Sequence, residues 1–329
     1  KKVDFKELTL INPEGEIQWR KVIYPKSETS YLIHSNSSDY IYFVDDLEPV
    51  NNMIRYNQVN ESGSVTSTKL NVLTVIRNYG YRTPDDVRIE NIVNTPNALV
   101  FHLSLEVDDK EIIENFFVTI THHNNRVYHM KGPETRPERV KEGKEGPVIY
   151  AGCDKEGIYF ARYTFQANNH RVNFIPIDSK AKPMNTYNYS LTSFNPIEST
   201  QKFYSNEGRY YINHEEGDER MVRGLPVYTN GQFLYIVNDA ELRKTVIYGA
   251  NESGEIVKLN ESEKLAASSR KYDGALGLCR NESGVTVFGG IEDGFMSMQI
   301  SGDTFSQLNI SREQSIAARK NPSILEESI

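Results

Sequence analysis

The chain has 329 residues, of which 38% are hydrophobic and 25% are charged, a composition that is typical of globular proteins and excludes a disordered chain. Its 45 acidic residues outnumber its 37 basic ones and give a net charge of -8; such a chain is repelled by nucleic acid and by anionic lipid, so neither is expected as a partner. No apolar run reaches the roughly 18 residues that a membrane-spanning helix needs, since the best one, residues 98–107, already contains His102 and Ser104.

The aromatic residues favour an all-β protein. Tyr occurs 20 times and Phe 14 times, whereas Trp19 is the single Trp, and Tyr and Phe in short apolar runs suit the half-buried surface of a sheet. The two cysteines, Cys153 and Cys279, are too few for a disulfide-stapled scaffold or a Cys-rich zinc module. Each lies at the end of the equivalent strand of its own repeat, and we expect the two positions to be too far apart for a disulfide.

The first repeated pattern is an alternating apolar run, a turn rich in Gly, Asn or Asp, and a second alternating run. Gly and Asn tolerate the positive φ that tight hairpin turns require. The six copies predict hairpins of strands 8–11 with 16–19, 53–60 with 64–70, 116–121 with 126–130, 171–177 with 185–191, 244–250 with 255–259, and 295–300 with 304–310.

A second kind of hairpin is interleaved with the first. Its turns are marked by Asp39, Asn97, Gly157, Gly231 and Gly284, at intervals of 58, 60, 74 and 53 residues. A period of this length with four short strands is typical of a β-propeller blade. The five copies predict strands 31–35 with 40–45, 92–95 with 99–107, 148–153 with 158–165, 227–229 with 233–237, and 275–279 with 285–289.

We predict one all-β domain over residues 1–310, a β-propeller of about six four-stranded blades, with five blades, seven blades and a pair of β-sandwiches as alternatives. Stacked blades bury apolar faces that a single four-stranded sheet leaves in water, and closing the ring removes its edges. The hairpin 6–23 belongs to the first kind and has no hairpin of the second kind ahead of it, so one blade is incomplete or completed unusually. A further strand pair is a candidate at 202–205 and 209–213. Residues 311–329 are predicted to be a C-terminal tail with a short helix over 312–320, and helix is negligible before residue 311.

The sequence Leu10-Ile11-Asn12-Pro13-Glu14-Gly15-Glu16-Ile17-Gln18-Trp19 resembles the outer hairpin of bacterial β-propeller repeat proteins of quinoprotein-like style. In those repeats an apolar strand, an Asp/Asn-x-x-Gly turn and a strand ending in Trp recur. The resemblance covers one repeat at the level of the superfamily and implies a propeller fold. It implies no quinone cofactor, because the adjacent cysteine pair of the quinone-binding family is missing.

Two long segments between strands are the candidate binding sites. Residues 132–147 contain three Pro and three Gly, and Pro cannot join a strand ladder, so we expect an exposed loop. Residues 71–90 form a second long connection, and long loops on a rigid scaffold commonly carry binding residues. The partner-binding candidates in the two segments are Arg77, Tyr79, Tyr81, Arg82, Arg136 and Arg139.

The sequence contains no common catalytic or metal-binding motif. It lacks His-Glu-x-x-His, Gly-x-Ser-x-Gly, a calcium loop and a phosphate-binding glycine loop. His122 and His129 lie on the two arms of one predicted hairpin, with His122 opposite Val127 and His129 opposite Ile120. That diagonal arrangement supplies two ligands where a metal site needs at least three. We therefore predict no catalytic residue, no metal and no cofactor.

These observations lead us to expect a non-catalytic propeller that serves as a rigid platform for protein interaction or ligand binding. We expect it outside the cytoplasm, in the periplasm, on the cell surface or secreted, as a component of an assembly with other protein subunits, and a glycan is a further candidate ligand. The alternative is a carbohydrate-active hydrolase with carboxylates around the propeller funnel. Its candidate carboxylates are Asp39, Asp45, Asp46, Asp154, Asp239 and Asp273.

Sequons for N-glycosylation are a separate feature of the chain. They matter in a secreted eukaryotic protein, although Asn-Glu-Ser-Gly is also favourable turn chemistry. The sequons begin at Asn36, Asn60, Asn188, Asn251, Asn260, Asn281 and Asn309.

Overall fold

The computed structural model describes residues 6–11, 15–23, 31–33, 40–48, 53–60, 62–81, 87–107, 112–135, 144–145, 148–166, 169–185, 187–192, 204–205, 225–229, 231–239, 244–250, 256–261, 276–281, 284–291, 294–301 and 304–311. Within these ranges the strands form six sheets, one of two strands, three of four strands and two of five strands. The predicted all-β class is confirmed. The chain divides into two compact units, each of which holds three of the sheets.

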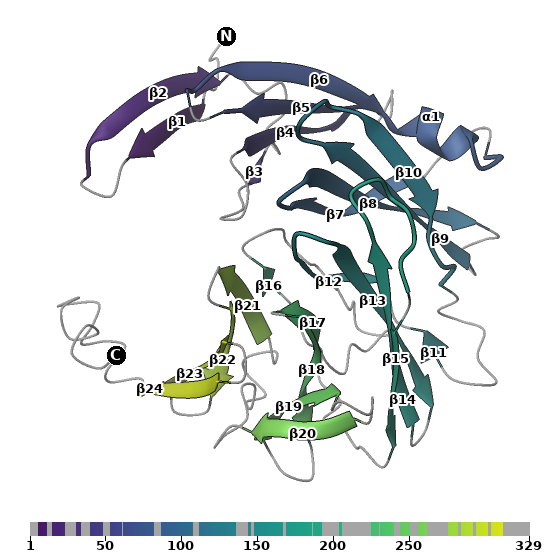
Figure 1. Cartoon of the computed structure of the whole chain (residues 1–329), viewed down its shortest axis with the longest axis vertical. Helices are drawn as coiled ribbons and strands as arrows, with labels where there is room; N and C mark the ends of the chain where they lie inside the picture. The colour runs from purple at the N-terminus through teal and green to yellow at the C-terminus, as the bar shows by residue number, and fades with distance from the viewer. Residues whose placement is uncertain are drawn as a thin grey trace. The chain divides into compact units, whose positions relative to one another are not determined.

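The first unit comprises residues 1–106, 114–132 and 179–181. Its smallest sheet is the hairpin of β1 (Lys6–Ile11) and β2 (Ile17–Ile23), in which Leu10 pairs with Trp19. The other two sheets are antiparallel and follow the order of the chain (Figure 1). They consist of β3 (Tyr31–Ile33), β4 (Ile41–Glu48), β5 (Met53–Val59) and β6 (Val65–Asn71), and of β7 (Val87–Asn94), β8 (Ala98–Val107), β9 (Ile112–Thr121) and β10 (Val127–Lys131).

The second unit comprises residues 107–113, 133–178 and 182–329. Its three sheets again pair strands in chain order, apart from two short additional strands. The first contains β11 (Lys144–Glu145), β12 (Ile149–Cys153), β13 (Ile158–Gln166), β14 (Asn169–Ile177) and β15 (Tyr187–Thr192). The second contains β17 (Leu225–Thr229), β18 (Gln232–Asp239), β19 (Lys244–Ala250) and β20 (Ile256–Glu261). The third contains β16 (Tyr204–Ser205), β21 (Leu276–Asn281), β22 (Gly284–Ile291), β23 (Gly294–Ser301) and β24 (Thr304–Ser311).

All eleven hairpins of the two repeated patterns are present as antiparallel strand pairs. The two kinds of hairpin also join as predicted, because a hairpin of the second kind and the hairpin of the first kind that follows it share one sheet. Local alternation and turn residues determine both results, since a hairpin is formed by neighbours in the chain. The four-stranded antiparallel unit is therefore the building block of both parts of the molecule.

Burial changes across one such sheet from its middle strands to its last strand. In β8 the eight residues from Ala98 to Leu105 are all buried, so both faces of that strand are covered. β9 is buried continuously from Glu114 to Ile120, whereas β10 is half-buried and exposes Val127 at its start. A strand covered on both faces accepts a polar side chain only where that side chain finds a partner.

The structure differs from the sequence analysis in the segment 71–90, where a loop is expected. A short helix, α1 (Val72–Arg77), begins after Asn71, whose side chain accepts a hydrogen bond from the backbone N–H of Thr74 at 3.2 Å. The helix buries Val72, Val75 and Ile76 on one face, which is the spacing of an apolar helical stripe. Among the described residues no helix is long and apolar enough to cross a membrane.

Two further segments contain short strands. The predicted loop 132–147 includes β11, which pairs with Phe165 and Thr164 of β13, and Thr135 forms an isolated bridge with Ile113. Of the predicted strand pair 202–205 and 209–213, residues 204–205 form β16, which pairs in parallel with β21. Residues 209–213 and the predicted helix 312–320 lie outside the described residues.

The predicted register of the β9–β10 hairpin is wrong by two residues. His129 pairs with Val118 and Val127 with Ile120, because the turn closes one residue earlier on each arm, with the N–H of Thr121 bonded to the carbonyl of Arg126 at 3.1 Å. Asn125 adopts a left-handed conformation with φ of 52°, which Asn tolerates better than most residues.

Cys153 at the end of β12 carries a thiol, as predicted. Cys279 lies within β21, but its side chain is outside the described part of the structure.

Gly152 in β12 provides a test of the packing in the second unit. A Cβ atom at this position would lie 2.2 Å from the carbonyl oxygen of Tyr228, and the φ of Gly152 is 156°. Gly152→Ala forces the backbone of one strand to move, so we expect it to lower the free energy of unfolding by about 3 kcal/mol in urea denaturation.

The matched control is Gly231→Ala. Gly231 has φ of 78°, but no atom lies within 4 Å of its would-be Cβ, so only the backbone conformation is penalised, by about 1 kcal/mol. Equal losses in the two variants would show that the contact between Gly152 and Tyr228 is not tight.

Candidate functional site

The segment that follows α1 packs onto β9 through two tyrosines. The ring centroids of Tyr79 and Tyr81 lie 5.4 Å and 6.0 Å from that of Phe116. Gly80 between them has φ of 94°, a conformation that glycine adopts at little cost. This turn brings two alternate side chains of the segment to the same phenylalanine.

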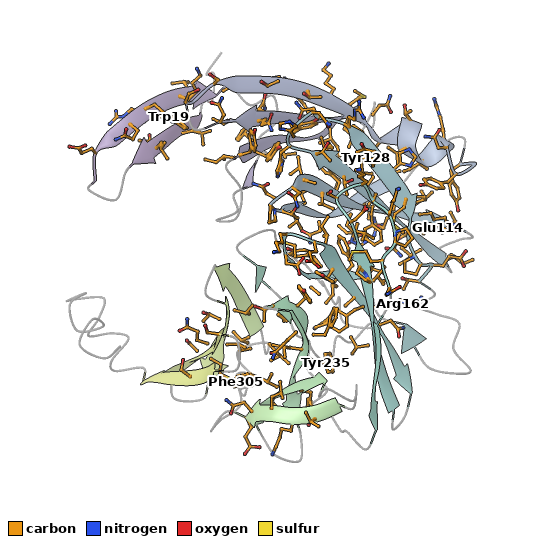
Figure 2. The ribbon with its side chains drawn as sticks, in the orientation of Figure 1. Trp19, Glu114, Tyr128, Arg162, Tyr235 and Phe305 are labelled. Carbon is orange, nitrogen blue, oxygen red and sulfur yellow. The ribbon has the colours of Figure 1, made fainter. Side chains whose placement is uncertain are left out.

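Glu114 is a buried carboxylate on the same face of β9 as Phe116 (labelled in Figure 2). The hydroxyl of Tyr81 donates to its Oε1 at 2.7 Å, and Nζ of Lys131 lies 2.8 Å from its Oε2. The side chain of Glu114 is 6% exposed and that of Lys131 is 33% exposed. Lys131 also donates to the hydroxyl oxygen of Tyr81 at 3.4 Å, so a phenol, a carboxylate and an ammonium group contact one another.

The pairing of β9 with β10 explains why Lys131 reaches Glu114. Lys131 is directly opposite Phe116, and residues two apart on a strand share a face, so Glu114 is its diagonal neighbour. An unpaired buried carboxylate would cost several kcal/mol. The hydrogen bond from Tyr81 and the ion pair with Lys131 offset that cost.

The protonation of the donors follows from their surroundings. Burial raises the pKa of Tyr81, and the hydrogen bond to Glu114 and its charge raise it further, so the phenol keeps its proton at neutral pH. Burial lowers the pKa of Lys131, but the hydrogen bonds to Glu114 and Tyr81 outweigh burial and leave it raised. Lys131 is therefore an ammonium group, and neither donor gives up its proton without a base.

His129 fixes the other end of the tyrosine segment. Its Nδ1 lies 2.9 Å from the hydroxyl of Tyr79, and its Nε2 lies 3.2 Å from Nδ2 of Asn78. His129 is two residues before Lys131 on β10, so both side chains lie on one face of the strand. We call these six residues, Asn78, Tyr79, Tyr81, Glu114, His129 and Lys131, the Glu114 cluster.

The structure places some of the predicted binding residues in this cluster. The side chains of Tyr79 and Tyr81 are half-buried, and their hydroxyls contact His129 and Glu114. Arg77 is exposed in the last turn of α1. Arg82, Arg136 and Arg139 lie outside the described residues.

Sequence reasoning missed Glu114 and Lys131, and it considered His129 only as a metal ligand. One signal for Glu114 was available: it lies in phase with Phe116, Val118 and Ile120, so it is an acidic residue on an apolar strand face. Such a residue needs a partner that the strand itself does not supply. The identity of the partner depends on contacts 17 and 33 residues away in the chain.

Among the candidate carboxylates of the hydrolase alternative, Asp154 is the one whose side chain the structure describes. Its Oδ1 accepts the backbone N–H groups of Glu156 and Gly157, each at 2.8 Å. Its Oδ2 accepts the hydroxyl of Tyr159 at 3.2 Å and that of Tyr228. A carboxylate has about four acceptor positions, and all are used here. Asp154 thus holds a turn and two stacked tyrosine rings together, and it is not placed to act as a base.

The two histidines weighed as metal ligands have different surroundings. Nε2 of His122 faces the carbonyl oxygen of Thr95 at 2.8 Å, which places its proton on Nε2. Nδ1 then accepts the hydroxyl of Tyr42 at 2.5 Å, while His129 contacts Tyr79. In the described part of the chain, no group of three or more His, Cys, Asp or Glu side chains is placed to hold a metal ion.

The chain has distant similarities to solved structures. It matches acylaminoacyl peptidase from Pyrococcus horikoshii with a TM-score of 0.37 and 10% identity, over 96% of this chain and 49% of the peptidase, so it spans about half of that protein. The RS223 β-xylosidase gives 0.31 and 11%, over 87% and 94% of the two chains. The GH43_1 enzyme from Xanthomonas citri, complexed with xylotriose, gives 0.34 and 8%, over 88% and 91%. No protein-family model and no curated protein sequence matches.

These comparisons correct one prediction. The expected non-catalytic platform is not borne out by these comparisons, since the solved structures named here include a xylosidase and a GH43 enzyme. The alternative, a carbohydrate-active hydrolase, agrees better with them. At these scores the similarity determines neither the family nor the reaction of this chain, and the quinoprotein-like style stays a prediction.

The ion pair of Glu114 can be tested through stability. Lys131→Met keeps an apolar side chain of similar length but leaves the buried carboxylate without its cation. We expect a loss of about 2 kcal/mol in urea denaturation, between the value of an exposed pair and that of a fully buried one.

Lys258→Met is the control for this test. Nζ of Lys258 lies 2.9 Å from Glu261 with side chains 48% and 29% exposed, so its loss should stay below about 1 kcal/mol. Equal losses for the two lysines would mean that Glu114 does not depend on Lys131.

Proposed function

We propose that the chain is a carbohydrate-active hydrolase and that Tyr81, Glu114 and Lys131 are its reacting groups. One observation supports this most directly: a half-buried phenol donates its hydrogen bond to a buried carboxylate. Some glycoside hydrolases use a tyrosine as the nucleophile, and a nucleophile of this kind needs an adjacent group to take its proton.

The proposed first step transfers the sugar to Tyr81. The phenol oxygen attacks the anomeric carbon, Glu114 takes the phenol proton through Oε1, and the bond to the leaving group breaks with its electron pair on the leaving oxygen. The raised pKa of Tyr81 means that the phenol needs this base. The ammonium group of Lys131, 3.4 Å from the phenol oxygen, stabilises the negative charge that develops there.

The second step releases the sugar. Water attacks the anomeric carbon and loses one proton, which the leaving oxygen of the first step takes up through the solvent, while the bond to Tyr81 breaks and Glu114 returns its proton to the phenol oxygen. The net change is cleavage of one glycosidic bond by one water molecule. We assign no general acid for the leaving group, and an aryl leaving group departs without one.

We propose that a ligand reaches the cluster from the side of Asn78. Asn78 is exposed, and Tyr79, Tyr81, His129 and Lys131 are each half-buried. Their amide, hydroxyl, imidazole and ammonium groups are hydrogen-bonding partners suited to sugar hydroxyls. Only the carboxylate of Glu114 is fully enclosed, which strengthens its electrostatic interactions.

We also propose that the four-stranded sheets are blades of one propeller of about six blades over residues 1–310, with 311–329 as a tail. The regular intervals of the sequence and the four-stranded antiparallel units support this proposal. A location outside the cytoplasm and a glycan ligand fit a hydrolase of this class and remain part of the proposal.

The activity can be measured with a panel of p-nitrophenyl α- and β-glycosides of pentoses, hexoses and uronic acids. The wild-type chain should hydrolyse at least one of them. Tyr81→Phe and Glu114→Gln should each lower kcat by about 100-fold or more, with the fold verified by circular dichroism.

Tyr159→Phe is the matched control, because it removes the same kind of hydroxyl from the other carboxylate, Asp154. It should leave kcat unchanged. Hydrolysis of no member of the panel, or the same rate in Tyr81→Phe and Tyr159→Phe, would contradict the proposal.

A further inference from the structure

The tetrapeptide Asn-Glu-Ser-Gly occurs three times, at 60–63, 251–254 and 281–284. Each copy lies between two antiparallel strands, namely β5 and β6, β19 and β20, and β21 and β22. Asn-x-Ser is the acceptor motif of N-linked glycosylation and implies a surface position. In the first of these turns the structure describes Asn60, Ser62 and Gly63.

Asn60 lies in an exposed turn that is closed by its own side chain. Its Oδ1 accepts the hydroxyl of Ser62 at 2.7 Å and the N–H of Ser64 at 2.9 Å. The N–H of Gly63 bonds to the Asn60 carbonyl at 2.9 Å, and Gly63 has φ of 73°. Because both bonds use the amide oxygen, Nδ2 of Asn60 makes no hydrogen bond with the described residues.

The hydroxyl of Ser62 is placed where the chemistry of the motif needs it. A donor on Oδ1 draws electron density to the oxygen and makes the protons on Nδ2 more acidic. It thereby favours the imidol form of the amide, in which Nδ2 is the nucleophile. One side of the turn is covered by the ring of Trp19, which a Cβ at Gly63 would approach to 3.1 Å. Asn60 itself is exposed.

Asn260 begins the same tripeptide, Asn-Glu-Ser, in a different setting. It lies within β20, paired with Ile247 of β19, and is half-buried. Its Oδ1 accepts the N–H of the adjacent Glu261 at 2.7 Å. An Asn and the residue after it cannot form such a turn while both are held in a ladder, and Asn260 and Glu261 are held by Ile247 and Val246. Ser262 lies outside the described residues. The two Asn residues thus differ in their setting, an exposed turn for Asn60 and a ladder for Asn260.

We propose that Asn60 is an acceptor site for an N-linked oligosaccharide in the folded chain and that Asn260 is not. The donor class is a lipid-pyrophosphate-linked oligosaccharide. Nδ2 bonds to the anomeric carbon and loses one proton to the transferase or solvent, while the bond from that carbon to the pyrophosphate oxygen breaks and the lipid pyrophosphate leaves with the electron pair. This site is independent of the proposed hydrolase activity.

The test uses the purified folded chain, a single-subunit oligosaccharyltransferase and its lipid-pyrophosphate-linked oligosaccharide, with glycopeptide mass spectrometry. We expect occupancy at Asn60 at least tenfold higher than at Asn260. Asn60→Gln should abolish the Asn60 glycopeptide, whereas Ser62→Thr should keep it, because Thr also supplies the hydroxyl.

Two synthetic peptides, residues 56–66 and 256–266, separate the motif from the fold. Without the sheet both should be accepted to similar extents. The proposal is overturned if the folded chain is not modified at Asn60, if Asn260 is modified to the same extent in the folded chain, or if the peptide 56–66 is refused.

Discussion

The burial of a carboxylate on the apolar face of β9 is the constraint on which the candidate site depends. Glu114 is in phase with Phe116, so a covered strand places it among side chains that offer it no hydrogen bond. The cost of leaving it unpaired is several kcal/mol. This cost is offset by the ion pair with Lys131 from the neighbouring strand and by the hydrogen bond from Tyr81 in the segment after α1. The same segment, with Gly80 at its turn, also packs on Phe116 through the rings of Tyr79 and Tyr81.

The comparison of two carboxylates explains why one is a candidate for chemistry and the other is not. Asp154 and Glu114 both accept tyrosine hydroxyls. Asp154 uses its remaining acceptor positions on two backbone N–H groups and so has none left for a new proton. Glu114 accepts a hydrogen bond from a phenol whose proton it can take, and its other oxygen forms an ion pair with Lys131. Saturation of the acceptor positions, rather than burial or the presence of a tyrosine, separates a structural carboxylate from a reactive one.

The hairpins and their grouping in fours could be predicted because they depend on alternation and turn residues within a few positions of the chain. The His122–His129 hairpin shows the limit of such reasoning. Its strands were predictable, but its register was not, since His122 leaves the ladder to bond with Tyr42 and Thr95. The segment 71–90 was singled out for Tyr79 and Tyr81 as binding residues, which stays a prediction. The contacts of both tyrosines lie on β9 and β10, and a single sequence contains no signal for which strand a loop will cover.

The most direct measurement traps the sugar on the enzyme. The chain is incubated with the 2-deoxy-2-fluoro glycosyl fluoride of the sugar whose aryl glycoside it hydrolyses fastest, since the fluorine at C2 slows the release step more than the transfer. Peptide mass spectrometry should then find the added glycosyl mass on the peptide that contains Tyr81 and find none after Tyr81→Phe. A label on any other residue, or no label while the aryl glycoside is still hydrolysed, would contradict the assignment of Tyr81 as the nucleophile.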